Sequence, residues 1–243
     1  MRKNIQTQAM ITVYTGPMFS GKSTALVNEL KIGQIPISIT GEMIAAGFKP
    51  IIDTRYSGFT YDESLGLYIG RIDLHNGNYT KCYGLKNFEE ICDAIKILDD
   101  RYGKIRRIGI DEANFFSDNP RDIQEILEYL AYHENREIIV AGLDLNYRGE
   151  PFHPVPEILS IADKVIKKTA VCVKCGNMHA TRSQRLDLVD IKNGKPIYNP
   201  SPYDAETIIV GGAAINSKEF QEHVYEPRCI ACHEVPGKPK RRK

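Results

Sequence analysis

Apolar runs alternate with segments of helical periodicity over most of the chain. The run AMITVYTG at residues 9–16 predicts a buried strand ending in a glycine-rich turn, and apolar residues at helical spacing predict a helix at 23–32. Strands that are apolar throughout and alternate with helices are typical of a doubly wound, mostly parallel α/β sheet, here up to about residue 170. Further strands are expected at 48–54, 105–113 and 137–145, and further helices at 87–103 and 122–135.

Two stretches depart from this alternation. Residues 55–81 are rich in Gly, Asp, Asn and Ser, which predicts a mobile loop with one weak strand. From Thr169 onward the chain carries paired cysteines and a hairpin pattern whose turn is Asn193–Gly194. We therefore predict a first domain at 1–168, a smaller second domain at 169–235 and a disordered basic tail at 236–243.

The composition is that of a soluble globular protein, with 42% hydrophobic and 26% charged residues. The net charge of +1 gives no sign of a polyanionic partner. No apolar run is long enough to span a membrane, and the N-terminal residues lack the apolar core of a secretory signal. We therefore expect a cytoplasmic protein without a membrane partner. In that setting the six cysteines are expected to be metal ligands and buried thiols rather than disulfides.

The segment GPMFSGKS, residues 16–23, has the Walker A spacing of a phosphate-binding loop (P-loop). It lies between the first predicted strand and helix, which is the context the motif requires. Gly16 and Gly21 would let backbone N–H groups converge on phosphate oxygens. Lys22 can reach the β and γ phosphates, and the Ser23 hydroxyl can ligate Mg²⁺. The competing explanation is a glycine-rich turn with a chance lysine.

A phosphate-binding loop needs a carboxylate at the end of a neighbouring strand to hold the metal ion. Asp111 and Glu112 follow an apolar run directly and meet this need. Asp111 would then serve Mg²⁺, while Glu112 would take a proton from an attacking hydroxyl or orient a water. Without the upstream loop, the same two acids would fit a helix N-cap equally well.

Two C-x2-C pairs lie in the last third of the chain, Cys172 with Cys175 and Cys229 with Cys232. Each pair can place two thiolates on one side of a tight turn, and two pairs complete a tetrahedral four-cysteine zinc site. The intervening segment is long for such a site and must form its own excursion. Two redox motifs are the alternative. Nearby histidines are close enough to substitute as ligands, and the isolated cysteines are expected to be buried; these are His179, His233, Cys82 and Cys92.

Taken together, these motifs resemble the cellular-type (type II, zinc-containing) thymidine kinase family. The resemblance covers essentially the whole chain. It implies a P-loop α/β domain with a small C-terminal zinc-binding domain that carries a lasso loop. It also implies phosphorylation of the 5′-hydroxyl of thymidine by ATP with Mg²⁺, giving dTMP and ADP. The matching segments are GPMFSGKST, FKPIIDTRYS, LHNG, IDEANFF, GLDLNYRGEPF, KKTAVCVKCGNMHATRSQR, VGG and YEPRCIACHEVPG.

The resemblance assigns roles around ATP. Ser23 and Asp111 would hold Mg²⁺, and Glu112 would be the general base for the 5′-hydroxyl. Arg55 would stabilise charge on the transferred phosphoryl group, and Lys22 is the third expected catalytic residue. The expected ATP and metal contacts are Gly16, Pro17, Met18, Phe19, Ser20, Gly21, Lys22, Ser23, Asp53, Arg55, Asp111 and Asn114.

The resemblance also implies a pocket for the nucleoside, covered by a lasso segment whose backbone groups read the pyrimidine edge. Family members are commonly homotetramers and are often inhibited by their end product. A homotetramer, dTTP as an inhibitor, a structural Zn²⁺ and no nucleic-acid partner are therefore expected. The expected nucleoside contacts are Met18, Phe115, Leu143, Tyr147, Phe152, Thr207, Ile208, Ile209, Val210, Gly211 and Tyr225.

Three features depart from the family pattern. Asn114 stands where the family usually has glutamine, and Asn146–Tyr147 stands where it usually has Asp-Phe. The tyrosine adds a hydroxyl to the base pocket, and a buried hydroxyl needs a partner. Residues 213–224 are an insertion that lengthens the lasso. These departures leave deoxyuridine or a close pyrimidine relative open as the substrate.

A P-loop ATPase or switch whose zinc module binds nucleic acid is the alternative from another functional class. The basic tail and the cysteine pairs motivate it. The zinc region, however, has mixed charges and no cluster of Lys and Arg interleaved with aromatic residues. An inactive nucleotide-binding regulator is a third hypothesis, which the intact lysine, serine and acid pair do not favour.

Overall fold

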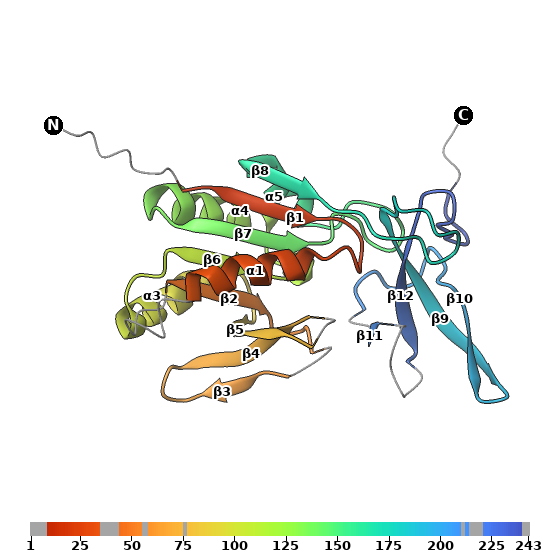
Figure 1. The fold of residues 1–243 in the computed structure, drawn as a ribbon, viewed down its shortest axis with the longest axis horizontal. Helices are drawn as coiled ribbons and strands as arrows, with labels where there is room; N and C mark the ends of the chain where they lie inside the picture. Colours follow the sequence, from red (N-terminus) through yellow and green to blue (C-terminus); the bar gives the residue numbers. More distant parts are fainter. Residues whose placement is uncertain are drawn as a thin grey trace. The chain divides into compact units, whose positions relative to one another are not determined.

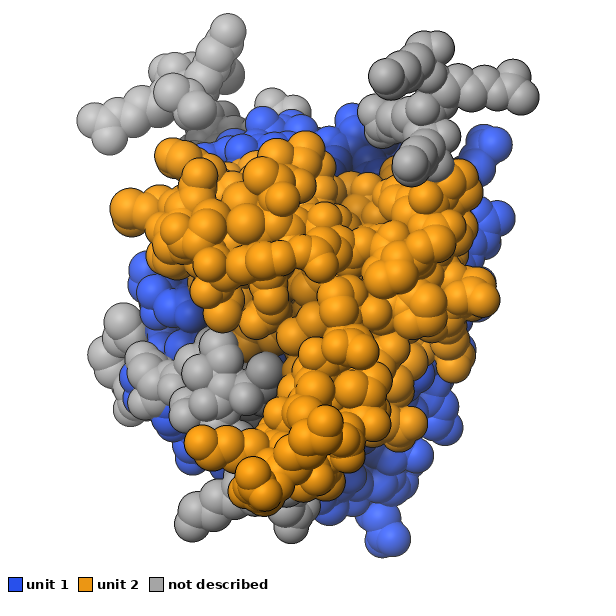
Figure 2. All heavy atoms as spheres, turned by 90° about the vertical axis from the view of Figure 1, so that its right-hand side faces the viewer, with its two compact units in different colours: residues 1–14, 23–142, 153–166 blue, residues 15–22, 143–152, 167–243 orange. Residues whose placement is uncertain are grey.

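The computed structural model describes residues 9–34, 44–54, 58–74, 77–209, 212–213 and 221–239. The chain divides into two compact units, coloured separately in Figure 2, each assembled from three segments. The predicted domain division at 168/169 stays a prediction, and the last break between the two units falls between Ile166 and Lys167. Unit 1 is Met1–Tyr14, Ser23–Gly142 and His153–Ile166, and unit 2 is Thr15–Lys22, Leu143–Phe152 and Lys167–Lys243.

The larger sheet lies chiefly in unit 1. Its described strands are β1 (Ile11–Thr15), β2 (Ala45–Pro50), β3 (Thr60–Asp62), β4 (Leu67–Asp73), β5 (Tyr79–Leu85), β6 (Arg107–Ile110), β7 (Glu137–Gly142) and β8 (Lys164–Lys167). Their order in the sheet is β3-β4-β5-β2-β6-β7-β1-β8 (Figure 1). β2 pairs in parallel with β5 and β6, and β6 pairs in parallel with β7. β3, β4 and β5 form an antiparallel edge. The predicted α/β class with a mostly parallel sheet is confirmed.

The polar stretch at 55–81 is more regular than predicted, because it contains β3, β4 and the start of β5. Its glycine at position 70 lies within a strand rather than in a loop. A Cβ on Gly70 would lie 2.6 Å from the ring of Phe59, and a Cβ on Gly84 would lie 2.7 Å from the same ring. These glycines therefore make room for an aromatic side chain. Residues 55–57 and 75–76 lie outside the described residues.

Four α-helices accompany this sheet in the described part of the chain: α1 (Lys22–Gln34), α3 (Glu90–Tyr102), α4 (Pro120–Glu128) and α5 (Val155–Ile161). α3 ends at Gly103, with a positive φ of 85°, as predicted. α4 begins two residues before its predicted start because the Asn119 side chain accepts a hydrogen bond from the Arg121 N–H and caps it. A π-helical turn, η2 (Tyr129–His133), follows α4.

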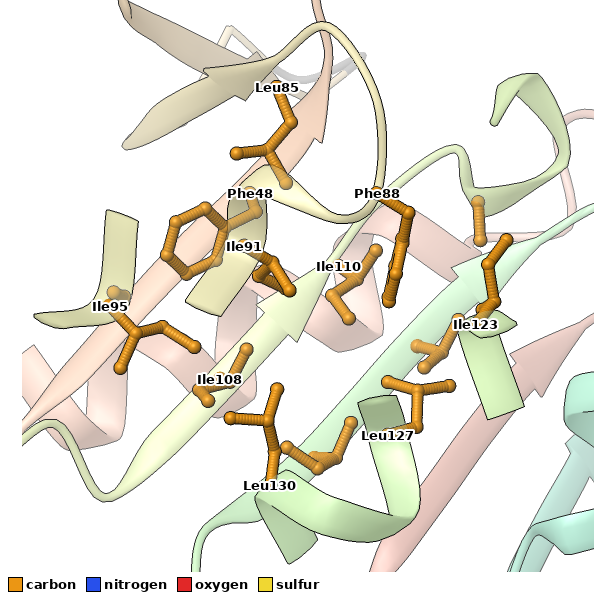
Figure 3. Packing of buried hydrophobic residues seen from close by; sticks show 14 of the residues in the cluster. Phe48, Leu85, Phe88, Ile91, Ile95, Ile108, Ile110, Ile123, Leu127 and Leu130 are labelled. Atoms are coloured by element: carbon orange, nitrogen blue, oxygen red, sulfur yellow. The ribbon is translucent and has the colours of Figure 1, made fainter. Parts of the chain in front are cut away.

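Unit 1 has an apolar layer on each face of its sheet. On one face, Leu26 and Leu30 of α1 pack with Ile139 of β7. On the other face, Ile108 and Ile110 of β6 pack with residues of α3 and α4 (Figure 3). Because strand side chains alternate, consecutive apolar residues serve opposite layers and both faces are covered by helices. This arrangement is the doubly wound one that the pattern predicted.

Helix α1 lies close to β2 and β6 because glycines there leave space for it. A Cβ on Gly109 would lie 2.9 Å from Leu30 Cδ1, and a Cβ on Gly47 would lie 3.0 Å from the same atom. At the residue before Leu30, the Arg107 guanidinium donates to the Glu29 carbonyl oxygen at 2.7 Å. These contacts fix the distance between α1 and the sheet.

Unit 2 contains a smaller sheet whose described strands are β9 (Arg182–Lys192), β10 (Lys195–Pro200), β11 (Gly212–Ala213) and β12 (His223–Arg228). Their order is β10-β9-β12-β11. β9 and β10 form the predicted hairpin. Asn193 and Gly194 both have positive φ, 52° and 72°, as a two-residue turn of this kind requires. β12 runs antiparallel to β9 and places Tyr225 opposite Arg185.

The start of the predicted disordered tail is ordered. The Tyr203 N–H donates to the Pro236 carbonyl oxygen at 2.8 Å, and the Lys238 ammonium donates to the Arg148 carbonyl oxygen and lies 3.7 Å from Glu150. The prediction of disorder from residue 236 is therefore wrong for 236–239. It was based on prolines and basic residues, but hydrogen bonds to distant residues hold this segment in place. Residues 240–243 lie outside the described residues.

None of the helices described is long and apolar enough to cross a membrane.

Replacing Gly109 by alanine should lower the free energy of unfolding by about 1–3 kcal/mol, because the added methyl group overpacks Leu30. Gly58→Ala is the control, since a Cβ on Gly58 meets nothing within 4 Å, and it should change stability by less than about 0.5 kcal/mol. Urea unfolding followed by circular dichroism measures both. Leu30→Ala should remove much of the Gly109→Ala penalty in the double variant. Strictly additive losses would contradict the contact.

Candidate functional site

In unit 1, Ser23 near the start of α1 meets Asp111 just after β6. The Ser23 hydroxyl donates to Asp111 Oδ1 at 3.0 Å. The Asp111 N–H donates to the Phe48 carbonyl oxygen at 2.9 Å, which fixes the backbone that carries the carboxylate. Neighbouring ligands of an octahedral Mg²⁺, each about 2.1 Å from the ion, lie about 3 Å apart. The two oxygens therefore have the spacing of a magnesium site.

Asp111 is a buried carboxylate with other acids nearby, and only 5% of it is exposed. Burial raises the pKa of Asp111 to about 7, and the carboxylates of Glu112 and Asp53 act in the same direction, while the Ser23 hydrogen bond opposes them. A cation placed beside Asp111 would favour its ionised form. Asp111 is therefore suited to binding a metal ion.

Glu112 has a left-handed backbone conformation, with φ 51° and ψ 41°. Residues with a side chain rarely adopt it, and such strain clusters at functional sites. The conformation turns the chain between β6 and the 3₁₀-helix η1 (Ala113–Phe115). The Glu112 side chain makes no capping hydrogen bond to η1. The helix-cap alternative for Glu112 therefore has no support, while a role in chemistry fits its half-buried position.

The remaining predicted site residues of unit 1 differ in how much the structure says of them. Asp53 pairs with Lys49 at 3.1 Å, and both side chains are nearly fully buried. Asn114 is buried, and its Oδ1 lies 3.4 Å from where a Cβ on Gly142 would be, at the end of β7. Phe115 is half-buried and Arg55 lies outside the described residues.

The glycine-rich loop, residues 15–22, belongs to unit 2. Gly16 has φ 129°, and a Cβ there would lie 2.2 Å from the Lys168 carbonyl oxygen, so the position admits only glycine. Phe19 and Gly21 also have positive φ, 61° and 78°. The Lys22 ammonium folds back over the loop and donates to the Pro17 carbonyl oxygen at 2.8 Å. A turn of this shape with a lysine above it fits the binding of phosphate oxygens.

Among the predicted nucleoside contacts of unit 2 that the structure describes, four are buried. Met18 donates its N–H to the Ser183 hydroxyl at 3.0 Å. The Tyr225 hydroxyl donates to the Ile209 carbonyl oxygen at 3.1 Å, which joins the lasso segment to β12. Val210 and Gly211 lie outside the described residues. Leu143, Tyr147 and Phe152 are buried, Met18 and Thr207 are half-buried, and Ile208 is exposed.

Two residues of β9 support predicted site residues, although no role was predicted for them. Ser183 accepts the hydrogen bond from Met18, and Arg185, which is fully buried, places its guanidinium carbon 3.9 Å from the centre of the Tyr147 ring. They lie two positions apart on one strand and therefore share a face. No local pattern in the sequence identifies them, because the predicted hairpin began after Arg185 and their partners are distant in sequence.

The four predicted zinc ligands lie together in unit 2. The sulfur atoms of Cys172, Cys175, Cys229 and Cys232 are all within 4.8 Å of one another. The Sγ atoms of Cys175 and Cys229 are 3.7 Å apart. Zinc bound tetrahedrally at about 2.3 Å requires sulfur atoms about 3.8 Å apart. The cluster therefore fits zinc, and the alternative of two separate redox motifs does not describe thiols that converge on one point.

The pKa values of two of the thiols also fit a metal site. Backbone N–H donors, including those of Cys229 and Cys175, overcome burial and lower the pKa of Cys172 to about 6. Hydrogen bonds to Cys175 and Cys229 raise the pKa of Cys232 to about 12. Cys172 therefore forms a thiolate readily, and a bound cation would favour the ionised form of Cys232 as well. Of the isolated cysteines, Cys82 is buried as predicted, and Cys92 is half-buried.

Comparison with known proteins connects these features. A family model described as "Thymidine kinase" matches residues 9–233. A curated thymidine kinase from Mycoplasmoides gallisepticum is 35% identical over 233 residues, which is 96% of this chain and 84% of that protein. Both matches span the glycine-rich loop, the acidic pair and the four cysteines.

Replacing Cys229 by serine should lower the zinc content well below one ion per chain, because a tetrahedral site loses one of its four ligands. Unit 2 should then be cut faster in limited proteolysis, while peptides from unit 1 keep their protection. Cys92→Ser is the control and should retain zinc. Metal analysis of the purified variants measures the ion directly. Unchanged zinc in Cys229→Ser would contradict the assignment.

Proposed function

Because this chain belongs to the thymidine kinase family, we propose that it transfers the γ-phosphoryl group of ATP to the 5′-hydroxyl of thymidine, giving dTMP and ADP. The observation that carries the proposal is the Ser23–Asp111 contact of 3.0 Å, with Glu112 next in the chain. This contact supplies two magnesium ligands, and Glu112 supplies a carboxylate beside them. Phosphoryl transfer needs positioning and charge stabilisation rather than covalent chemistry from the protein.

In this proposal residues 16–22 bind the phosphates of ATP. Gly16 and Gly21 permit the turns that aim backbone N–H groups at phosphate oxygens, and Lys22 leaves its contact with Pro17 to pair with them. Ser23 and Asp111 hold Mg²⁺, which neutralises charge on the phosphate oxygens when bound. The remaining proposed contacts with ATP or the metal shell are Met18, Phe19, Ser20, Asp53 and Asn114.

Glu112 acts as the general base in the proposed reaction. Its carboxylate accepts the proton of the 5′-hydroxyl as that oxygen attacks the γ-phosphorus, and the bond from phosphorus to the bridging oxygen of ADP breaks. Arg55 stabilises charge on the transferred group, as its place in the family motif suggests. Two observations support this assignment: the strained backbone of Glu112, and the nearness of its carboxylate to Asp111, whose pKa it helps to raise.

The nucleoside is proposed to lie against Met18, Phe115, Leu143, Phe152 and Tyr225. Backbone groups of the lasso segment, residues 207–211, read the edge of the base. Support for this part comes from the Tyr225 hydroxyl, which holds the lasso at Ile209. Zn²⁺ bound by the four cysteines serves structure rather than chemistry, because all four ligands are protein thiolates and no position is open.

The homotetramer, inhibition by dTTP and the cytoplasmic location stay predictions. Residues 214–220 of the predicted insertion lie outside the described residues. A nucleic-acid-binding switch is not favoured, since one kinase family model spans both the loop and the cysteine cluster.

Glu112→Ala should abolish most of the thymidine-dependent release of ADP in a coupled assay with ATP and Mg²⁺. A lost general base typically costs about 10²–10⁴-fold in rate. Glu125→Gln is the control, because Glu125 is an exposed partner of Arg121 on α4 and should keep wild-type activity. The wild-type protein is assayed with a panel of nucleosides. ADP release that does not depend on any nucleoside would refute the kinase proposal.

A further inference from the structure

Tyr147, which replaces the usual phenylalanine of the family, is presented by a rigid loop in unit 2. Leu145 pairs with Pro151, and the Asn146 N–H donates to the Glu150 carbonyl oxygen at 2.9 Å. The Asn146 side chain in turn accepts from the Arg148 N–H at 2.9 Å. These bonds close the loop on both sides of the tyrosine and leave its ring little freedom.

The Tyr147 hydroxyl is engaged by backbone carbonyl groups. It lies 2.8 Å from the Pro202 oxygen and 2.9 Å from the Ala205 oxygen, and its single proton is shared between them. These carbonyls belong to a turn, in which the Ala205 N–H donates to the Pro202 oxygen at 3.3 Å. We call residues 201–206 the lasso foot, because they lead directly into the lasso segment at 207–211.

Arg185 fixes the same lasso foot. Its Nε donates to the Ser201 hydroxyl at 2.8 Å, and its NH1 donates to the Glu206 carbonyl oxygen at 2.5 Å. Its guanidinium covers one face of the Tyr147 ring, 3.9 Å from the ring centre. Arg185 therefore ties the two ends of the foot, while the Tyr147 hydroxyl ties the turn between them.

The backbone of Tyr147 is tied to the cysteine cluster. His233, which follows the zinc ligand Cys232, has its Nε2 2.8 Å from the Tyr147 carbonyl oxygen. A carbonyl oxygen can only accept, so Nε2 carries the proton and donates. Tyr147 is thus bound to the lasso foot through its hydroxyl and to the neighbour of a cysteine ligand through its carbonyl oxygen.

We propose that Tyr147 is a positioning residue whose hydroxyl fixes the lasso foot, so that the lasso is held ready for the nucleoside. This inference rests on the proposed function for its effect on activity, but the contact itself is independent of it. The resemblance to the family would place the Tyr147 hydroxyl against the base, but this hydroxyl donates to the carbonyl oxygens of Pro202 and Ala205. The side chain is only 2% exposed, which agrees with a structural partner rather than a free polar group.

The variant Tyr147→Phe tests the proposal, because it removes the hydroxyl and keeps the ring. Hydrogen exchange of peptides covering 201–209 should become faster in the absence of any substrate. The KM for thymidine should rise about five-fold, the ratio expected for one typical net hydrogen bond, while the KM for ATP stays unchanged. Tyr132→Phe is the control, because the Tyr132 hydroxyl donates to Asp163 and both residues belong to unit 1. It should leave all three quantities at their wild-type values.

The outcomes separate this inference from the proposed function. Unchanged exchange at 201–209 in Tyr147→Phe would overturn the role of the hydroxyl, whatever the enzyme's substrate. Faster exchange with an unchanged KM for thymidine, or with equal rises in both KM values, would overturn its effect on the nucleoside. A wild-type protein that does not phosphorylate thymidine would refute the proposed function, and the exchange measurement would still judge the contact.

Discussion

The close approach of α1 to β6 is the constraint on which the contact between Ser23 and Asp111, the proposed metal-binding pair, depends. Leu30 can lie on the sheet only because Gly47 and Gly109 lack side chains. Once the helix is seated there, running antiparallel to β6, its first turn reaches the carboxyl end of the strand. Ser23 then meets Asp111. The packing of Leu30 against two glycines therefore sets the distance between the Ser23 hydroxyl and the Asp111 carboxylate.

The burial that this packing produces also sets the chemistry. Asp111 is shielded from water and stands near Glu112 and Asp53, which makes its negative charge costly without a cation. In unit 2 the sulfur atoms of four cysteines lie within 4.8 Å of one another, an arrangement that fits a metal ion. Each unit thus carries a cluster of groups that fits a cation. The cluster of unit 1 offers oxygen ligands, and the cluster of unit 2 offers sulfur ligands.

Much of this arrangement could be predicted from the sequence, because the relevant signals are local. The order of glycines, Lys22 and Ser23 between a strand and a helix, and the spacing of the cysteines, are patterns that few other structures share. The α/β class followed from apolar strands alternating with helices. Only one weak strand was predicted where β3, β4 and the start of β5 lie, because Gly70 of β4 indicates a loop in the sequence but makes room for Phe59 in the structure.

The supports of the lasso foot could not be predicted for a related reason. The partners of the Tyr147 hydroxyl lie 55 and 58 residues away in the chain, and no pattern in the sequence around Tyr147 indicates them. Arg185 gives no local sign that it is fully buried, because arginine inside a strand is more often solvent-exposed. The order of residues 236–239 likewise depends on contacts with Tyr203 and Arg148.

The most direct test of the account is the magnesium dependence of thymidine phosphorylation in Asp111→Asn. The asparagine keeps the size of the side chain but loses the charge that the metal requires. At saturating ATP and thymidine, the rate should fall at least about ten-fold, and half-maximal activity should require more Mg²⁺ than in the wild type. A rate profile that superimposes on that of the wild type at every Mg²⁺ concentration would contradict the account.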